Sequence, residues 1–238
     1  MCQLLPRQDK AIRSFIKSID IPANKCITKA EFDELIKYMG YIPDEAPNGV
    51  HIMHRNGRLF HKEYWTVSNS NASGIALKTE NVGFVIAKDA VYDIIWGNNG
   101  VNVGGFMSEI EEIALTDLAG QENTSKIISD MEAASYYAAK YCYEYQFIHG
   151  KNGYLPALGE WREVEKNINE IDDYMNFIGG IEIMGNPDLE EYSFKWSSTQ
   201  SHLCCAWYFS TLYGETGYNY QNKKTVDSLS CARPFAPF

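Results

Sequence analysis

The feature that most constrains the fold is a change of periodicity along the chain. Apolar residues recur at helical spacing through Ser125–Tyr145 and again through Ala157–Ile171, as expected when one stripe of a helix packs on a core. A third apolar phase over Tyr174–Ile178 ends at Gly179-Gly180, and the residues after Tyr192 have the composition of strands and turns. Two main helices followed by a strand-rich C-terminal part predict an α+β domain.

Strands are also predicted before these helices. Val50–His54 and Arg58–Phe60 flank the pair Asn56-Gly57, which accepts the positive φ of a tight hairpin turn. Two more strands are predicted to follow, over Gly74–Lys78 and Val82–Lys88.

The first 45 residues predict a short helical segment ahead of the domain. Apolar residues over Ile12–Ile19 have helical spacing, and Thr28 and Glu31 have the spacing of a capping box at the start of a second helix. A linker with prolines and glycine follows. We therefore divide the chain into an N-terminal helical segment, residues 1–45, and one domain, residues 46–238. Oligomerisation through the N-terminal segment is an open alternative.

The balance of charge argues against several classes of function. The chain has 31 acidic and 21 basic residues, for a formal net charge of −10. Nucleic-acid binding needs clustered Lys and Arg, and so does attraction to anionic membranes. No apolar run approaches the ~18–20 residues of a membrane helix, and the first residues do not resemble a secretory signal. We expect no nucleic-acid partner and no membrane insertion. The location is left open: the protein either stays in the cytosol or reaches a phage virion or cell surface by another route.

The residue types that can bind metals or form disulfides do not occur at the spacings that such sites require. The six cysteines form no CxxC pair and no regular framework. His51 and His54 are an odd number of positions apart, so on a strand they point to opposite faces. Asn186-Pro187-Asp188 resembles part of a calcium-dependent lectin site, but the companion Trp-Asn-Asp motif is absent, which leaves the oxygen cage incomplete. We predict no metal and no cofactor.

A set of motifs in the second half of the chain resembles a known family. They are Gly153-Tyr154-Leu155-Pro156-Ala157-Leu158-Gly159-Glu160-Trp161, Trp196-Ser197-Ser198-Thr199-Gln200, Ala206-Trp207, Gly214, Lys223 and Ala232-Arg233-Pro234-Phe235. In this order and spacing they resemble the variable proteins of diversity-generating retroelements, of the type found in gut bacteria and their phages, and the wider group of bacterial C-type-lectin-like domains. Lys195 departs from the pattern, which usually has an aromatic residue there. The resemblance implies a C-type lectin-like fold that displays a diversified ligand-binding surface.

Residues 201–230 are compatible with this resemblance on independent grounds. Such retroelements mutate adenines, and replacing the two adenines of an Asn codon cannot give Lys, Gln, Glu, Met or Trp. Only five residues of that set occur in the segment: Trp207, Glu215, Gln221, Lys223 and Lys224. Trp207 and Lys223 fall where the family pattern has a fixed residue. The runs Ser201–Cys205 and Thr225–Ser230 show no strand alternation, helical period or turn chemistry. Over residues 208–212 alternate side chains predict a strand with one face outward and Phe209 pointing in.

The candidate ligand-binding residues all come from this variable segment. They are Ser201, His202, Leu203, Cys204, Cys205, Tyr208, Ser210, Leu212, Tyr213, Gly217, Tyr218, Tyr220, Val226, Asp227, Ser228 and Leu229. We expect Tyr208, Ser210, Tyr213, Tyr218 and Tyr220 to cluster on one exposed face, as aromatic contact residues do in antibody paratopes. Trp196, Trp207 and Phe235 are expected to be buried and to hold the fold.

These residues predict a binding module and no enzyme, with a macromolecular partner, either a protein or a surface glycan. One alternative is a lectin-like surface adhesin that is not diversified. A less favoured alternative is an oxidase of the formylglycine-generating type, which shares this fold type and uses reactive cysteines. Cys204-Cys205 would be its candidate pair, but neither thiol has a charge-rich sequence neighbourhood that would lower its pKa.

Overall fold

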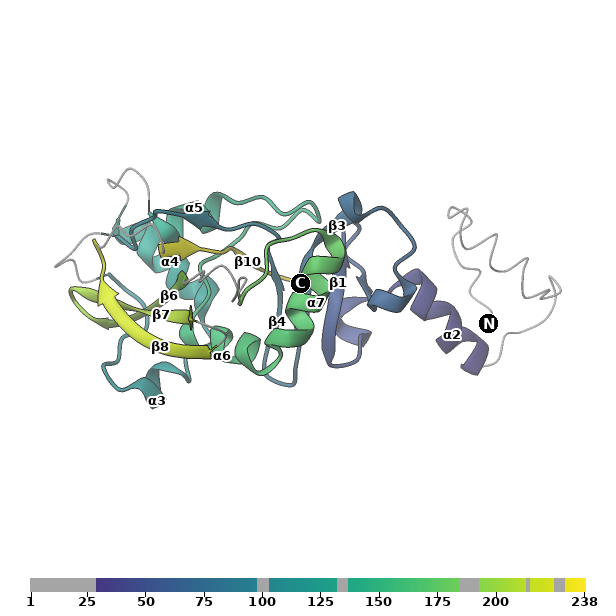
Figure 1. Cartoon of the computed structure of the whole chain (residues 1–238), viewed down its shortest axis with the longest axis horizontal. Helices are drawn as coiled ribbons and strands as arrows, with labels where there is room; N and C mark the ends of the chain where they lie inside the picture. The colour runs from purple at the N-terminus through teal and green to yellow at the C-terminus, as the bar shows by residue number, and fades with distance from the viewer. Residues whose placement is uncertain (1–28, 98–102, 132–136, 185–192, 213–214, 225–229) are drawn as a thin grey trace.

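The computed structural model describes residues 29–97, 103–131, 137–184, 193–212, 215–224 and 230–238. Within them two five-stranded sheets and several helices form an α+β architecture (Figure 1). The predicted fold class is therefore confirmed at this level. The helix over 12–19 and Thr28 of the capping box lie outside the described residues. No described helix has the length and apolar character that crossing a membrane requires.

The first sheet contains the predicted hairpin. Its strand order is β10-β4-β3-β1-β2, with β1 (Gly49–His54), β2 (Leu59–Phe60), β3 (Ala72–Lys78), β4 (Gly83–Ile86) and β10 (Phe235–Pro237). The hairpin forms as predicted, and Gly57 has a φ of 81°. The Gly57 N–H donates to His54 O, so Arg55 and Asn56 are the central residues of the turn and only Gly57 has a positive φ. The turn is therefore not the two-residue turn centred on Asn56-Gly57 that the sequence predicts. β10 pairs with β4, so the last residues of the chain complete a sheet that begins near residue 49.

The second sheet holds most of the candidate ligand-binding segment. Its order is β5-β9-β6-β7-β8, with β5 (Val91–Tyr92), β6 (Ser193–His202), β7 (Cys205–Leu212), β8 (Glu215–Asn222) and β9 (Ser230–Ala232). The strands β6, β7 and β8 form an antiparallel meander, whereas β9 runs parallel to β6. β8 is an edge strand and β7 lies inside the sheet.

The first long helix predicted from the sequence is two helices. α4 (Gly120–Asp130) ends before Met131, and α5 (Ala138–Glu144) begins after Tyr137, whose backbone is extended. The expectation of one continuous helix is wrong because the backbone N–H of Ala138 donates to Ile95 O, which lies outside any helix. Thr124 lies inside α4, and its hydroxyl donates to Leu155 O and accepts from the Leu155 N–H.

The second long helical region is also divided. α6 (Leu158–Lys166) and α7 (Ile168–Ile178) meet at Asn167, whose side chain donates to Glu163 O. The third apolar phase of the sequence belongs to α7. That helix ends at Gly179, which has a φ of 75°, a left-handed conformation that favours glycine at a C-terminus. The one-turn helix α3 (Glu111–Ala114) lies near the second sheet.

The motif residues of the sequence form the core between the layers. Trp161 of α6 stacks on Phe209 of β7 with 5.4 Å between ring centroids, and its ring lies 4.9 Å from that of Phe235. Trp196, Trp207 and Phe235 are all buried, as predicted. α6 thus joins β7 of the second sheet to β10 of the first through three aromatic rings.

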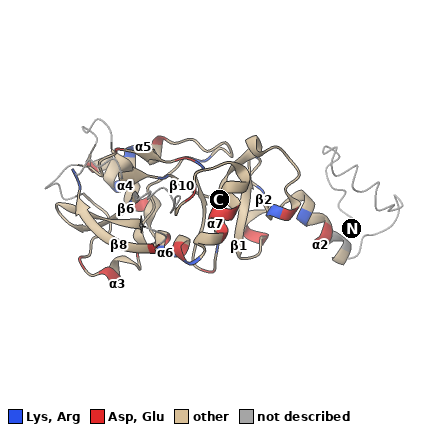
Figure 2. Ribbon diagram, in the orientation of Figure 1, with Lys and Arg blue, Asp and Glu red and all other residues tan. Residues whose placement is uncertain are grey.

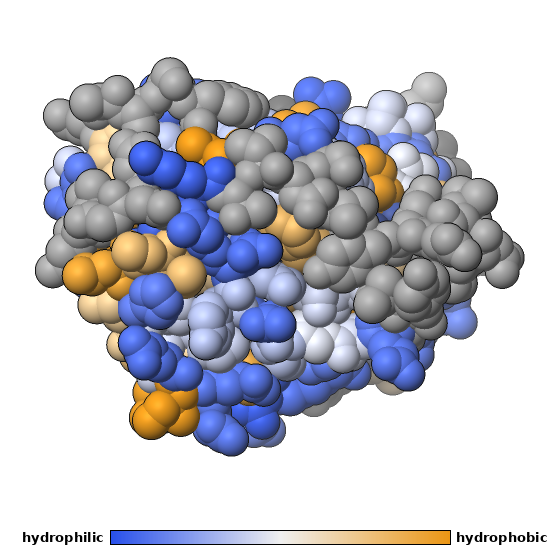
Figure 3. Space-filling view, turned by 60° about the vertical axis from the view of Figure 1, so that its left-hand side comes forward, coloured by the Kyte–Doolittle hydropathy of each residue, from blue (hydrophilic) through white to orange (hydrophobic). Residues whose placement is uncertain are grey.

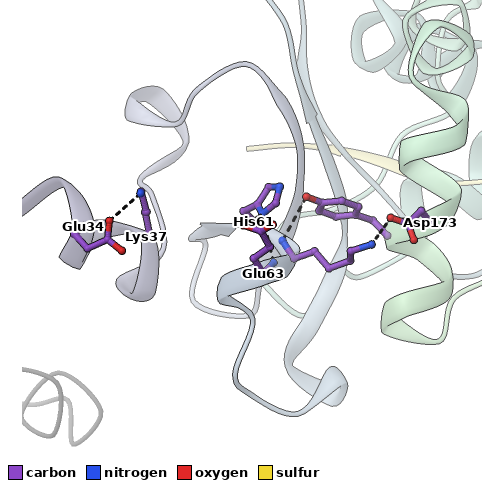
Figure 4. A network of polar contacts seen from close by, with 7 residues as sticks. Glu34, Lys37, His61, Glu63 and Asp173 are labelled. Atoms are coloured by element: carbon purple, nitrogen blue, oxygen red, sulfur yellow. Dashed lines mark hydrogen bonds and ion pairs between the residues drawn. The ribbon is translucent and has the colours of Figure 1, made fainter. Parts of the chain in front are cut away.

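The N-terminal helix α2 (Lys29–Met39) lies at the end of the molecule opposite to β8 and α3 (Figure 1). Lys37 pairs with Glu34 at 2.9 Å and lies over the ring of Tyr64, in the 3-10 helix η2 (Lys62–Tyr64). Lys62 in turn pairs with Asp173 of α7 (Figure 4). The other 3-10 helices are η1 (Pro43–Glu45) and η3 (Asn69–Asn71). These contacts attach α2 to the first sheet's end, away from the candidate surface.

Candidate ligand-binding surface

Strand β7 is buried on both of its faces. Trp207 and Phe209 point to one side, and Tyr208 points to the other, where its ring lies 4.9 Å from Phe194 and 6.2 Å from Trp196. Tyr208 is only 8% exposed. The expectation that Tyr208 lies on an exposed face is therefore wrong, because β7 is an inner strand and side chains cover both of its surfaces.

The candidate tyrosines do not share one face either. β7 and β8 pair so that Trp207 faces Tyr220 and Phe209 faces Tyr218. Directly paired residues lie on the same side of a sheet, so both tyrosines of β8 are on the side opposite to Tyr208. The predicted single cluster is thus split between two faces, because side chains alternate along each strand.

The remaining candidates have varied environments. Ser201 is buried, and its Oγ has no hydrogen-bond partner among the described residues. Half-buried candidates are His202, Cys204, Cys205, Ser210, Gly217 and Tyr218, whereas Leu203 and Tyr220 are exposed. Leu212 belongs to β7. Tyr213, Val226, Asp227, Ser228 and Leu229 lie outside the described residues.

The turn between β6 and β7, residues 202–205, which we call the hairpin tip, contains the exposed candidate Leu203. The other exposed candidate, Tyr220, lies on the adjacent strand β8. Leu203 and Tyr220 are each 46% exposed. The ring of His202 lies 6.0 Å from that of Tyr220, which in turn lies 5.2 Å from Trp207 in an edge-to-face contact. The backbone N–H of Cys204 donates to His202 Nδ1 at 3.3 Å. An aromatic and aliphatic surface therefore covers the tip and the adjacent edge of β8.

The two thiols of the tip are free. Burial raises the pKa of the Cys205 thiol, and the neighbouring Cys204 raises it further, while Lys223 opposes the change. A raised pKa keeps Cys205 in the thiol form at neutral pH. This environment is the reverse of the one that activates a nucleophilic cysteine.

A buried lysine supports the tip from below. Lys223 Nζ donates to Gln200 Oε1 at 2.6 Å and lies 4.5 Å from the ring centroid of Trp96. Burial lowers the pKa of Lys223 to about 8. Its backbone N–H also donates to Cys204 O, and Gln200 Nε2 donates to Val103 O. The tip is thus tied through Lys223 to β6 and to the segments after β5.

A hydrogen bond joins Trp207 to a segment that the sequence analysis did not assign to the site. Its Nε1 donates to Ser108 O at 2.8 Å, and Met107 forms a bridge with Gln200. Residues 107–113 therefore lie next to the tip. Three apolar side chains of this segment are exposed: Met107 at 44%, Ile110 at 56% and Ile113 at 46%. The alternation of apolar and acidic residues here is a sequence signal that could have indicated an exposed strip.

The end of the molecule that carries the second sheet is mostly hydrophilic, with a few separate hydrophobic groups (Figure 3). On the same side of β8 as Tyr220, Glu165 of α6 accepts hydrogen bonds from the hydroxyls of Thr216, at 2.5 Å, and Tyr218. These bonds hold the first half of β8 against α6. The second half, with Tyr220, projects beyond that contact.

The histidines and the buried glutamate outside the hairpin tip do not form a second candidate site among the described residues. His51 Nε2 contacts Pro47 O, and the described side chains contain no group of three His, Cys, Asp or Glu arranged to hold a metal ion.

A depression of about 540 Å³ is lined in part by Glu160, whose carboxyl group accepts hydrogen bonds from Tyr154 OH at 2.8 Å and from the Ala157 N–H at 2.7 Å. Burial raises the pKa of Glu160 to about 8. Its bonds make it a cap of α6. Residues 186–188 lie outside the described part.

Comparison with known proteins gives a likeness of fold. No protein-family model matches the chain, and no curated protein matches it. A similar solved structure is the crystal structure of a fimbrial protein from Bacteroides ovatus ATCC 8483, with a TM-score of 0.54 and 10% sequence identity. The alignment covers 81% of this chain and 49% of that protein, so the chain spans about half its length. At this identity the likeness concerns the fold alone.

Proposed function

We propose that this chain is a binding module of C-type lectin-like fold, and that its ligand surface is the hairpin tip with the adjoining edge of β8. One observation carries the proposal: exposed Leu203 and Tyr220 lie on a base that is fixed by the buried hydrogen bond of Lys223 and the partly buried hydrogen bond of Trp207. A rigid base lowers the entropy lost when exposed side chains bind a partner. Aromatic residues with few rotamers are well suited to such contacts.

The proposal includes diversification of the tip by a retroelement. His202, Leu203, Cys204 and Cys205 are all residues that a mutated Asn codon can encode, whereas Lys223 is not and supports the tip. A scaffold tolerates random side chains only where they do not pack into the core. Sequencing of the neighbouring DNA tests this part, since a near-copy of the codons for residues 201–238 beside a reverse transcriptase gene is expected. Its absence would leave an invariant binding module.

Binding is tested with the whole chain against a random-peptide display library and a glycan array. We expect ligands to be enriched and their binding to be lost in the double variant Leu203→Asn, Tyr220→Asn. The matched control is Tyr38→Asn, Ile42→Asn, two exposed apolar residues near α2 at the opposite end. If ligands bind both double variants as well as the parent, the tip is not the ligand surface.

A second candidate is a surface adhesin that is not diversified. The likeness of fold to a protein named a fimbrial protein favours it, and the same tip would then bind one fixed receptor. The two candidates differ in one observable. Isolates of the source organism would share the codons of residues 201–205 if the chain is an invariant adhesin, and would differ there if it is diversified.

A further inference from the structure

The hairpin tip is continuous with residues 107–113. Ser108 N–H donates to Gln200 O at 3.0 Å, and Ser108 O accepts from Trp207, so this segment is fixed along the base of the tip. Ala114 of α3 packs in one cluster with Trp207, and half-buried Tyr218 packs against that cluster. Tyr220 makes an edge-to-face contact with the Trp207 ring. One surface therefore runs from the tip across Trp207 to α3.

The added part of this surface is acidic as well as apolar. Glu109, Glu111 and Glu112 are exposed and alternate with the exposed apolar side chains of the same segment. Figure 2 shows the acidic residues at α3. The described ion pairs include none of these three glutamates. A basic side chain in the same neighbourhood is Arg162, which acts electrostatically on Tyr218, as Glu111 does.

We propose that this surface docks a basic polypeptide segment in which Lys or Arg side chains flank apolar anchors. The inference rests on the proposed function and names the class of its partner. Exposed apolar groups gain free energy when a partner removes them from water. Carboxylates at the rim favour cationic partners and repel anionic ones, which sets specificity and association rate more than affinity. A neutral glycan would use the apolar groups but leave the three glutamates without a complement.

The experiment uses three synthetic peptides that share the same leucine and tyrosine positions and carry lysine, serine or glutamate elsewhere. Binding to the whole chain is measured by fluorescence anisotropy. We expect the lysine peptide to bind at least about tenfold more tightly than the serine peptide. This advantage should largely disappear between about 0.1 M and 1 M salt, where the Debye length falls from about 10 Å to about 3 Å.

The charge is tested by Glu109→Gln, Glu111→Gln, Glu112→Gln together, with thermal melting to show that α3 remains folded. The matched control removes three exposed acids at the other end of the molecule: Asp33→Asn, Asp44→Asn and Glu45→Gln. We expect the first variant to lose about tenfold in affinity for the lysine peptide and the control to lose none.

Failure of this inference can be told apart from failure of the proposed function. Equal binding of the lysine and serine peptides, binding of neither, or an equal loss in the control variant overturns the basic-partner inference. In each of these cases the proposed function stands if another ligand depends on Leu203 and Tyr220. If no ligand of any class depends on those two residues, both proposals fall.

Discussion

Strands β7 and β8 are neighbours in one sheet and come from the same segment of sequence, yet they have opposite roles. β7 is covered on both faces: on the Tyr208 side, Ile127 of α4 and Ala138 of α5 belong to the same core cluster as Tyr208, and on the other side Trp161 stacks on Phe209. β8 is an edge strand with half-buried and exposed side chains throughout. The comparison shows that a segment which resembles a diversified region can contain scaffold positions, and that position in the sheet decides which residues are displayed.

Some backbone N–H groups of the edge strand β8 are bonded by side chains, which the inner strand β7 does not require because it pairs with a strand on each side. The backbone N–H groups of Tyr220 and Asn222 are bonded by the side-chain oxygens of Asn219 and Gln221, the residues directly before them. Unpaired edge groups are otherwise a template for strand pairing between molecules. The edge therefore presents side chains, and part of its backbone is already satisfied.

The largest expected effect contrasts the two aromatic residues that touch across β7 and β8. Trp207→Ala should lower the free energy of unfolding by about 3–5 kcal/mol, because it empties a buried aromatic site and removes the bond to Ser108. Tyr220→Ala should cost less than about 1 kcal/mol, since its ring is half in water. Urea denaturation measures both. Similar losses in the two variants would contradict the division into scaffold and display strand.

The same division is tested inside the candidate set. Tyr208→Asn should cost about 3 kcal/mol, because it leaves a cavity and buries an amide among aromatic rings. The four-site variant His202→Asn, Leu203→Asn, Cys204→Asn, Tyr220→Asn should stay within about 1 kcal/mol of the parent. Chemical denaturation compares them. Unfolding of the four-site variant would show that the tip is structural and would remove the basis for a tolerant display surface.

The third prediction is that the free energy of unfolding depends on pH through Glu160, a residue of the scaffold. The folded pKa of Glu160, about 8, lies above its ordinary value near 4.5, so the folded state retains a proton that the unfolded state loses. This contribution to stability is full below pH 4.5 and is lost as the pH rises toward 8. Relative to Glu160→Gln, the parent should lose on the order of 2 kcal/mol between pH 5 and pH 8. Parallel stability curves for the two proteins would rule this out.

The smallest effect concerns two serines of β6. Ser201 Oγ is buried without a partner among the described residues, whereas Ser197 Oγ donates to Trp207 O at 2.9 Å. Ser201→Ala should therefore be neutral or stabilising by less than about 1 kcal/mol, and Ser197→Ala should destabilise by about 1 kcal/mol. Thermal melting of the two variants measures this difference. If Ser201→Ala is the more destabilised variant, Ser201 makes a hydrogen bond in the folded protein.

The sequence alone determined those features that depend on local chemistry. The hairpin near Gly57 follows from the positive φ that glycine accepts, although its turn is centred on Arg55 and Asn56. The end of α7 follows from the left-handed conformation of Gly179. The burial of Trp196 and Phe235 could also be predicted, because both belong to the motifs that carry the family resemblance and are expected to hold the fold. The α+β class followed from the order of the periodic patterns.

Only the tertiary structure decided where the helices break and which candidates are displayed. The interruption between α4 and α5 depends on the bond from Ala138 to Ile95, a contact that no local pattern encodes. Tyr208 and Tyr220 have the same chemistry and the same permitted codons, but one lies on an inner strand and the other on the edge strand. The part played by residues 107–113 depends on the bond from Trp207 to Ser108. Strand order and long-range hydrogen bonds join residues far apart in the chain, and for that physical reason only the folded structure could decide these three features.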